Sequence, residues 1–244
     1  MHFEPWQWAL AVGAALFVGV SKTGIGGLGM LSVAMFAQIL PAKQATGVVL
    51  PLLIFGDIIA AASYRRHTLW NFVGRLFPWT AAGVVIGYFA LGRINDHQAK
   101  VLIAVIILGL LGVHLARRRG VVRDDQPHAA WFAPTIGVLV GFTTLMANAA
   151  GPLMAIYLLA MRLPKMEFIG TSAMFFLLLN LFKVPFMVNL GLINTSSFMV
   201  NLTLAPAVFL GAWFGRKILV RLNQRWFENL ALVASAVAGA RLLF

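Results

Sequence analysis

Long apolar stretches, separated by short polar stretches, follow one another along almost the whole of this chain. The hydrocarbon layer of a membrane is about 30 Å thick, and a helix of roughly 20 apolar residues spans it. The pattern therefore predicts an all-α polytopic membrane protein. The predicted apolar segments are 6–40, 44–64, 72–92, 99–116, 130–161, 167–190, 197–219 and 226–244.

Two of these segments, 6–40 and 130–161, are too long for one ordinary span and too short for two. Each has polar or helix-breaking residues near its centre, "SKTGIGGLG" in the first and "TTLMANAAGP" in the second. Either each segment is one long crossing, or each is a hairpin that enters and leaves the membrane on the same side. Single crossings would make the two halves of the chain parallel, and hairpins would make them inverted, with three further helices in each.

The two broken segments open two related halves of the sequence. A shift of 123 residues matches Ser21 with Thr144, Pro41 with Pro164, and Gly47 with Gly170. After a five-residue insertion the shift becomes 128, and it matches Pro78 with Pro206, Gly83 with Gly211, Gly87 with Gly215, Arg93 with Arg221, and Asn95 with Asn223. We therefore predict one membrane domain built from a first repeat at 1–116, a linker at 117–128 and a second repeat at 129–244.

Lysine and arginine residues distinguish the two arrangements, because cytoplasmic loops of membrane proteins carry an excess of them. With the linker placed inside, hairpins put thirteen of these residues inside and four outside. Single crossings give eight inside and nine outside, which is no bias. The count favours hairpins, inverted halves and a cytoplasmic linker, and pairs of short spans would give the same parity.

The composition agrees with a membrane protein that has no separate soluble domain. Of the 244 residues, 61% are hydrophobic and 11% are charged, which is too few charges for a soluble surface. The net charge of +12 is therefore attributed to cytoplasmic loops and not to nucleic-acid binding. The absence of cysteine excludes disulfides, thiolate metal sites and cysteine nucleophiles. The first residues lack a cleavable-signal pattern, and we expect a multi-pass protein of a bacterial-type inner membrane.

The broken segments predict an anion site near the middle of the membrane. Inverted-repeat transporters bind substrate where two broken helices meet, and helix N-termini bind anions. Glycines in the first break leave amide groups unobstructed, and the second break begins a new helix between Asn148 and Pro152. The structural alternatives are close helix packing for the glycines and bonds back to their own helix for the hydroxyls. The predicted ligands are Ser21, Lys22, Thr23, Gly24, Gly26, Gly27, Gly29, Thr143, Thr144, Asn148 and Gly151.

Three charges are predicted to lie inside the membrane, where charges are costly and mark functional sites. Lys22 lies about fifteen residues from either end of its segment, which disfavours snorkelling to the membrane surface. Asp57 either carries a coupling ion, such as a proton, or pairs with a basic residue. Asn180 matches Asp57 under the shift of 123, and Lys183 follows it by one turn. Lys183 is either a second substrate contact or the partner of Asp57.

The stretches "GVSKTGIGGLGMLSVAMFAQILPAKQATGVVLPLLIFGDIIA" and "GTSAMFFLLLNLFKVPF" resemble the TauE/SafE family, also called the sulfite exporter or toluene sulfonate uptake permease family. The resemblance covers nearly the whole chain, and "SKTGIGGLG" is its most specific element. It implies about eight hydrophobic segments in two repeats and transport of small sulfur-containing anions such as sulfite, thiosulfate or sulfoacetate. The second repeat departs from the pattern because "TTLMANAAGP" has fewer glycines and no lysine, which predicts an asymmetric site.

Other function classes fit the sequence less well. A metalloenzyme needs clustered histidine and acidic ligands, whereas the five histidines lie at segment edges or in loops. A membrane scaffold or assembly factor stays as the alternative, since it would need neither Lys22 nor paired breaks. We predict a secondary transporter, not an enzyme, that carries an anion by alternating access without a cofactor. A proton or cation co-substrate, the direction of transport and a homo-oligomeric state are left open.

Overall fold

The computed structural model describes residues 3–23, 32, 35–36, 38–91 and 131–241, together with isolated residues between 93 and 115. The secondary structure of the described residues is helical, as predicted. The elements are α1 (Pro5–Thr23), α3 (Ala42–Tyr64), the short 3-10 helix η1 (Arg65–His67), α4 (Trp70–Leu91), α6 (Phe132–Ala147), α7 (Ala150–Ala160), α8 (Lys165–Asn189), α9 (Thr195–Arg221) and α10 (Gln224–Arg241). The linker at 117–128 and most of the predicted segment 99–116 lie outside the described residues.

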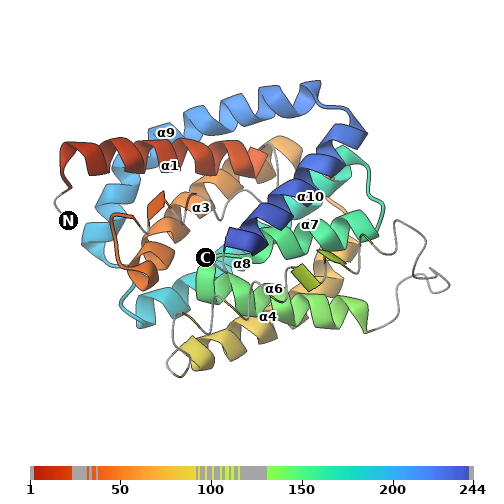
Figure 1. Cartoon of the computed structure of the whole chain (residues 1–244), viewed down its shortest axis with the longest axis horizontal. Coiled ribbons are helices and arrows are strands. Elements are labelled where there is room, and N and C mark those ends of the chain that lie inside the picture. Colours follow the sequence, from red (N-terminus) through yellow and green to blue (C-terminus); the bar gives the residue numbers. More distant parts are fainter. Residues whose placement is uncertain are drawn as a thin grey trace.

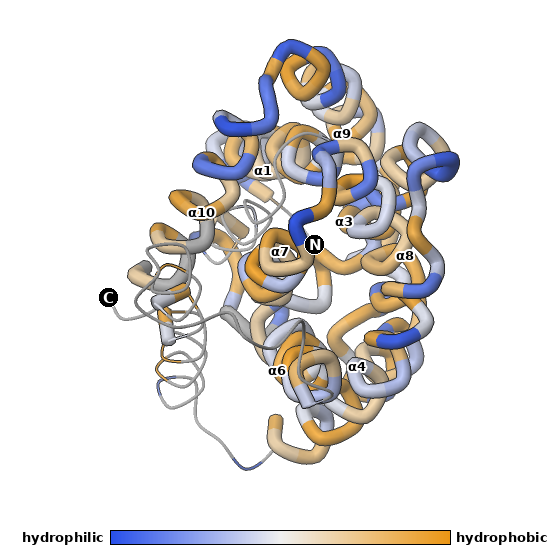
Figure 2. Tube along the Cα trace, turned by 90° about the vertical axis from the view of Figure 1, so that its right-hand side faces the viewer, coloured by the Kyte–Doolittle hydropathy of each residue, from blue (hydrophilic) through white to orange (hydrophobic). Residues whose placement is uncertain are grey.

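Four helices of the described chain are long and apolar enough to cross a membrane: 44–67, α4, α8 and α9. They coincide with four of the segments that the sequence predicted. Figure 2 shows the hydrophobic residues along the helices and the more hydrophilic residues gathered at turns and helix ends. Large apolar side chains such as Phe89 and Phe209 are more than half exposed on the outer helices, as expected of surfaces that contact lipid.

The helices form three layers (Figure 1). Helices α1 and α9 lie side by side in one layer, and α4 and α6 lie side by side in the opposite layer. Helices α3 and α8 pack against each other between them, and α10 packs on α7. The middle layer is the only one that contacts both outer pairs among the described helices, so its side chains form the centre of the protein.

Helix starts follow local sequence signals. At the start of α9 the Asn194 side chain accepts a hydrogen bond from the Ser197 amide at 2.9 Å, and the Ser197 hydroxyl accepts one from the Asn194 amide at 3.0 Å. This reciprocal arrangement satisfies amides that the first helical turn leaves unpaired. Helices α3 and α8 both begin directly after an extended proline, Pro41 and Pro164. These are the two prolines that the shift of 123 residues matched.

Glycines at two interfaces make the same kind of contact. A Cβ atom on Gly211 of α9 would lie 2.0 Å from the carbonyl oxygen of Leu16 in α1. A Cβ atom on Gly83 of α4 would lie 2.2 Å from the carbonyl oxygen of Val138 in α6. Both interfaces therefore depend on backbones that approach as closely as glycine allows. Leu16 of α1 and Val138 of α6 make equivalent contacts and are 122 positions apart. Under this shift Lys22 corresponds to Thr144, whereas the shift of 123 residues matched Thr144 with Ser21.

The two central helices run antiparallel. Gly47 near the start of α3 abuts Leu192, just beyond the end of α8. Gly170 near the start of α8 abuts Tyr64 and His67, at the end of α3 and in η1. The two helices that the repeat matches thus point in opposite directions, which is the relation that inverted halves require.

The predicted break in segment 130–161 lies at Asn148 and Ala149. Asn148 adopts a left-handed conformation with φ 51° and ψ 32°, and it ends α6. The chain then turns back, because the ring of Phe132 at the start of α6 stacks on Tyr157 near the end of α7, with centroids 5.7 Å apart. Helices α6 and α7 therefore form a hairpin whose two ends meet and whose tip is the break.

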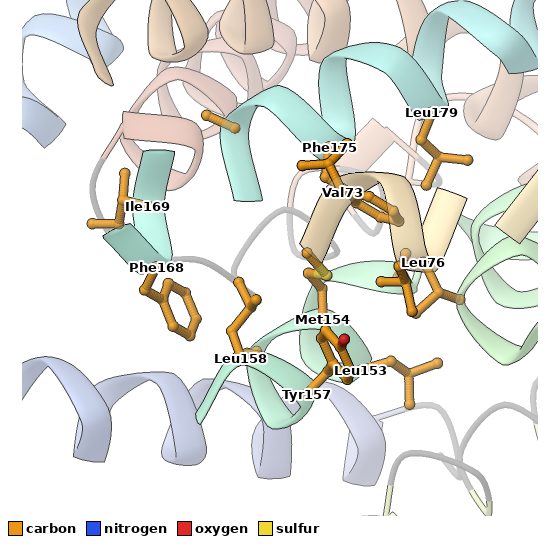
Figure 3. Close-up of a cluster of buried hydrophobic side chains, with 14 of the residues drawn as sticks. Val73, Leu76, Leu153, Met154, Tyr157, Leu158, Phe168, Ile169, Phe175 and Leu179 are labelled. Carbon is orange, nitrogen blue, oxygen red and sulfur yellow. The ribbon is translucent and has the colours of Figure 1, made fainter. Parts of the chain in front are cut away.

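Apolar packing holds this hairpin against its neighbours. Figure 3 shows side chains of α7, including Met154 and Tyr157, in one cluster with side chains of α4 and α8, such as Leu76 and Phe175. All four side chains are buried. The tip of the hairpin is therefore fixed relative to α8, which carries several of the predicted site residues.

Basic residues gather where several helices end together. The Thr68 hydroxyl after η1 donates to the carbonyl of Gly170 in α8, and the Lys165 amide donates to the Gln224 side chain in α10. These bonds place the end of α3 and the starts of α8 and α10 at one end of the protein. Residues at or beside these helix ends include Arg65, Arg66, Arg162, Lys165, Arg221 and Arg225.

Candidate functional site

The centre of the protein is a contact between two polar side chains that the repeat matches. The Asn180 amide of α8 donates a 2.6 Å hydrogen bond to Oδ2 of Asp57 in α3. Asp57 is fully buried and Asn180 is 2% exposed. Because the two residues are 123 positions apart, each half of the chain supplies one member of the pair. The contact therefore lies where an axis relating the two halves would pass.

Lys22 of α1 completes this contact. Its Nζ lies 2.7 Å from Oδ1 of Asp57, so the two residues form an ion pair between α1 and α3. The ammonium also lies 4.6 Å from the centre of the Phe176 ring. The lysine stem passes Gly56, where an added Cβ would lie 3.0 Å from the lysine Cγ. Of the two roles predicted for Asp57, pairing with a basic residue is the one this geometry displays.

Lys183 forms a second polar cluster with the tip of the α6–α7 hairpin. Its Nζ donates to the Thr144 hydroxyl at 3.1 Å and to Oδ1 of Asn148 at 2.5 Å. The amide nitrogen of Asn148 in turn donates to the carbonyl of Thr46 in α3 at 3.0 Å, which fixes the orientation of the Asn148 side chain. Lys183 is fully buried, and no described carboxylate forms an ion pair with it.

The two clusters belong to one electrostatic unit. Lys183 interacts electrostatically with both Asp57 and Lys22. Helices α1 and α6 both end at this level of the protein, and their C-terminal carbonyls carry partial negative charge that lysines offset. Helix α7 begins beside Asn148, at Ala150, without a side-chain cap, so its first amides lack a partner within the helix. The arrangement offers cations and hydrogen-bond donors, which is suited to an anion.

The other predicted hydroxyl ligands are engaged with backbone. The hydroxyls of Ser21 and Thr143 donate to carbonyls of their own helices, at 2.9 Å to Val18 and at 2.8 Å to Leu139. The Thr23 hydroxyl lies 2.7 Å from the carbonyl oxygen of Ala212 and so joins α1 to α9. These are the structural alternatives considered for such hydroxyls. Gly151 lies in the first turn of α7, beside the break.

The glycines of the first break, Gly24, Gly26, Gly27 and Gly29, lie outside the described residues, and their role stays a prediction. Two features of the site were not anticipated from the sequence. The first is the stacking of the Lys22 ammonium on Phe176, for which a phenylalanine one turn before Asn180 was the available signal. The second is the contact of the Lys183 ammonium with the hairpin tip. The charge of Lys183 was evident from the sequence, but its hydrogen-bond partners were not. Within the described part of the chain no group of histidine and acidic residues could hold a metal ion.

Comparison with known proteins gives one match. A family model described as "Sulfite exporter TauE/SafE" matches residues 11–242, which is nearly the whole chain. No curated protein and no solved structure matches the chain. The matched region includes every candidate site residue described above.

Proposed function

The chain belongs to the TauE/SafE family of membrane transporters, and from this premise we propose that it carries sulfite or a small organosulfonate such as sulfoacetate. The substrate binds at the central polar site, between the hairpin tip and helices α1, α3 and α8. Binding uses Lys183 and Lys22, the amide groups at the start of α7, and the first break. Asp57 is the group that couples transport to an ion.

The observation that carries this proposal is the burial of Lys183 beside a helix break. A buried ammonium is costly unless it is paired, and neutral oxygens of Thr144 and Asn148 only partly replace its hydration. Among the described residues the one buried carboxylate, Asp57, is already in contact with Lys22. A bound anion would supply the missing charge, and the start of α7 would supply further donors.

Alternating access fits the packing of the described helices. Helix α1 of the first half packs on α9 of the second, and α6 of the second half packs on α4 of the first. With α3 antiparallel to α8, this reciprocity supports two inverted halves that rock against each other around the central site. The alternative, a non-transporting scaffold, has no use for charged residues at the contact between the halves.

We place the protein in the inner membrane, with the basic end of the helices and the linker at 117–128 on the cytoplasmic side. This orientation rests on the excess of lysine and arginine there. An inside-negative potential drives a monovalent anion outwards by about 2.3 kcal/mol per charge per 100 mV. Export therefore needs no coupling ion, whereas accumulation in the cell needs one.

Anion binding to purified protein tests the function directly. We would measure thermal unfolding in detergent with sulfite, thiosulfate, sulfoacetate, methanesulfonate and acetate, for the wild type and for Lys183→Met. A substrate at 100 times its Kd stabilises the folded state by about 2.7 kcal/mol, so a sulfur oxyanion should raise the unfolding temperature of the wild type. The variant should lose this rise, because the cation that the substrate contacts is gone.

The matched control is Lys217→Met, which removes an exposed lysine that stacks on Trp213 of α9. This control should keep the full response to the anion. A wild type that no sulfur anion stabilises, or equal responses in the wild type and Lys183→Met, would contradict the proposed site. Absence of any response would favour the scaffold.

A further inference from the structure

The central site holds three formal charges that do not cancel. Lys22 and Lys183 each contribute one positive charge, and Asp57 contributes one negative charge. The remaining acidic residues of the described helices, Glu167 and Glu228, lie within five residues of a helix start and not at this contact. In their ionised forms these three groups give the site one positive charge in excess.

We infer that the site balances one negative charge, so that a monoanion is carried alone and a dianion is carried together with one proton on Asp57. The inference rests on the proposed function and adds to it the charge and the coupling ion. Its basis is that Asp57 and Lys183 are fully buried and that the Lys22 side chain is 12% exposed, because an unbalanced charge in a site closed to water costs far more than the same charge in solution. A monoanion brings the sum of charges to zero, whereas a dianion leaves it at minus one.

Asp57 is the group placed to correct that imbalance. Its Oδ1 contacts Lys22 of α1, and its Oδ2 accepts from Asn180 of α8. Lys183 of α8 is the other charged group that acts on it among the described residues. A dianion draws both ammonium groups towards itself and away from the carboxylate. Asp57 then lacks a cation, and a buried carboxylate without a cation takes up a proton.

The proton balance of the cycle follows from this exchange. The proton comes from the solution on the side where the dianion enters, and it binds Oδ1 as Lys22 turns to the substrate. When the site opens to the other side and the dianion leaves, Lys22 returns to Asp57 and the proton is released there. One proton thus accompanies each dianion in the same direction. A monoanion is balanced by Lys183 while Lys22 stays on Asp57, and no proton moves.

The test compares a fixed dianion with a fixed monoanion in proteoliposomes that contain a pH-sensitive dye. Sulfoacetate carries a sulfonate and a carboxylate and is a dianion near neutral pH, whereas methanesulfonate is a monoanion under all these conditions. The wild type should move one proton with each sulfoacetate and none with methanesulfonate. Flux of both anions without protons, or with equal numbers of protons, would overturn the inference and leave the proposed function intact.

A double variant tests the charge count itself. Lys22→Met with Asp57→Asn removes one positive and one negative charge, so Lys183 alone keeps the excess at plus one. The proton that accompanies sulfoacetate should fall from one to none, and the preference for sulfoacetate over methanesulfonate should fall with it. Glu167→Gln, which removes a carboxylate in the first turn of α8, should keep one proton per sulfoacetate.

The outcomes separate the two proposals. A double variant that still moves one proton per sulfoacetate would show that Asp57 is not the carrier and would overturn the inference. Wild-type vesicles that move neither anion would overturn the proposed function, and the inference with it. The wild-type proton count decides the inference even if the double variant is inactive.

Discussion

At the scale of single residues, the contact between Lys22 and Asp57 should dominate the stability of the central site. Lys22→Met leaves Asp57 buried beside Asn180 without its cation. Removing one partner of a buried ion pair typically costs about 3–5 kcal/mol, whereas replacing both partners costs much less. We therefore expect Lys22→Met to destabilise the protein strongly and the double variant with Asp57→Asn to recover most of the loss. Thermal unfolding of the four proteins in detergent measures the coupling.

Lys217→Met serves as the control for loss of a lysine, because that side chain is exposed. Its free energy of unfolding should lie within about 0.5 kcal/mol of the wild-type value. Additive effects of the two central substitutions would mean that Lys22 and Asp57 do not depend on each other. The 2.7 Å contact would then not describe the protein in detergent.

The sequence identified the charged residues of the site but not their partners. Lys22, Asp57 and Lys183 were recognisable because each interrupts an apolar segment. Their pairing joins helices that are far apart in the sequence, and it depends on how α1, α3 and α8 pack. Lys22 was predicted from the sequence as a substrate ligand, whereas the structure pairs it with Asp57 and leaves Lys183 with the neutral side chains of Thr144 and Asn148.

At the scale of elements, the length of an apolar segment was enough to predict α3, α4, α8 and α9. The break in the second long segment was also predictable, because Asn148 tolerates a left-handed conformation and Pro152 suits the first turn of α7. The register between the halves was not predictable to the residue. The stretch from α1 to α3 is one residue shorter than the stretch from α6 to α8, and the glycine contacts reveal this difference.

Close packing at the α4–α6 interface gives a prediction for a single helix. Gly83→Ala places a Cβ 2.2 Å from the carbonyl oxygen of Val138, which forces the two backbones apart. Overpacking of this kind costs about 1–3 kcal/mol. The free energy of unfolding in detergent should fall by that amount. Gly211→Ala at the α1–α9 interface should have a similar effect, since its Cβ would lie 2.0 Å from the Leu16 carbonyl oxygen.

Gly74 on the same helix provides the matched control. Nothing lies within 4 Å of a Cβ built there, and the residue is exposed. Gly74→Ala should therefore leave stability unchanged or raise it by about 0.5–1 kcal/mol, the difference in helix propensity. Equal effects of Gly74→Ala and Gly83→Ala would mean that the close interface does not contribute to stability.

At the scale of the whole molecule, the halves repeat their packing and differ in their charges. The Asp57 position of the first half holds Asn180 in the second, and the Lys22 position holds Thr144. The Lys183 position of the second half corresponds to Ala60 in the first under the shift of 123. Two similar halves thus enclose one charged site and not two. The excess of one positive charge arises from this divergence, since identical halves would carry an even total.

The orientation of the two halves in the membrane, inverted or parallel, can be tested by labelling single cysteines. If segment 130–161 is a hairpin, Trp131 and Arg162 face the same side of the membrane; if it is one crossing, they face opposite sides. The natural chain has no cysteine, so single cysteines can be labelled without background. We expect Trp131→Cys and Arg162→Cys to react with a membrane-impermeant maleimide only in inside-out vesicles.

Ser196→Cys, at the start of α9, should react only in right-side-out vesicles, and the cysteine-free chain should not react in either. All three positions are exposed in the protein, so a lack of reaction reports the membrane and not burial. Reaction of Trp131→Cys and Arg162→Cys from opposite sides would make the halves parallel. Helices α3 and α8 would then have to cross in the same direction, which contradicts the contacts of Gly47 with Leu192 and of Gly170 with Tyr64.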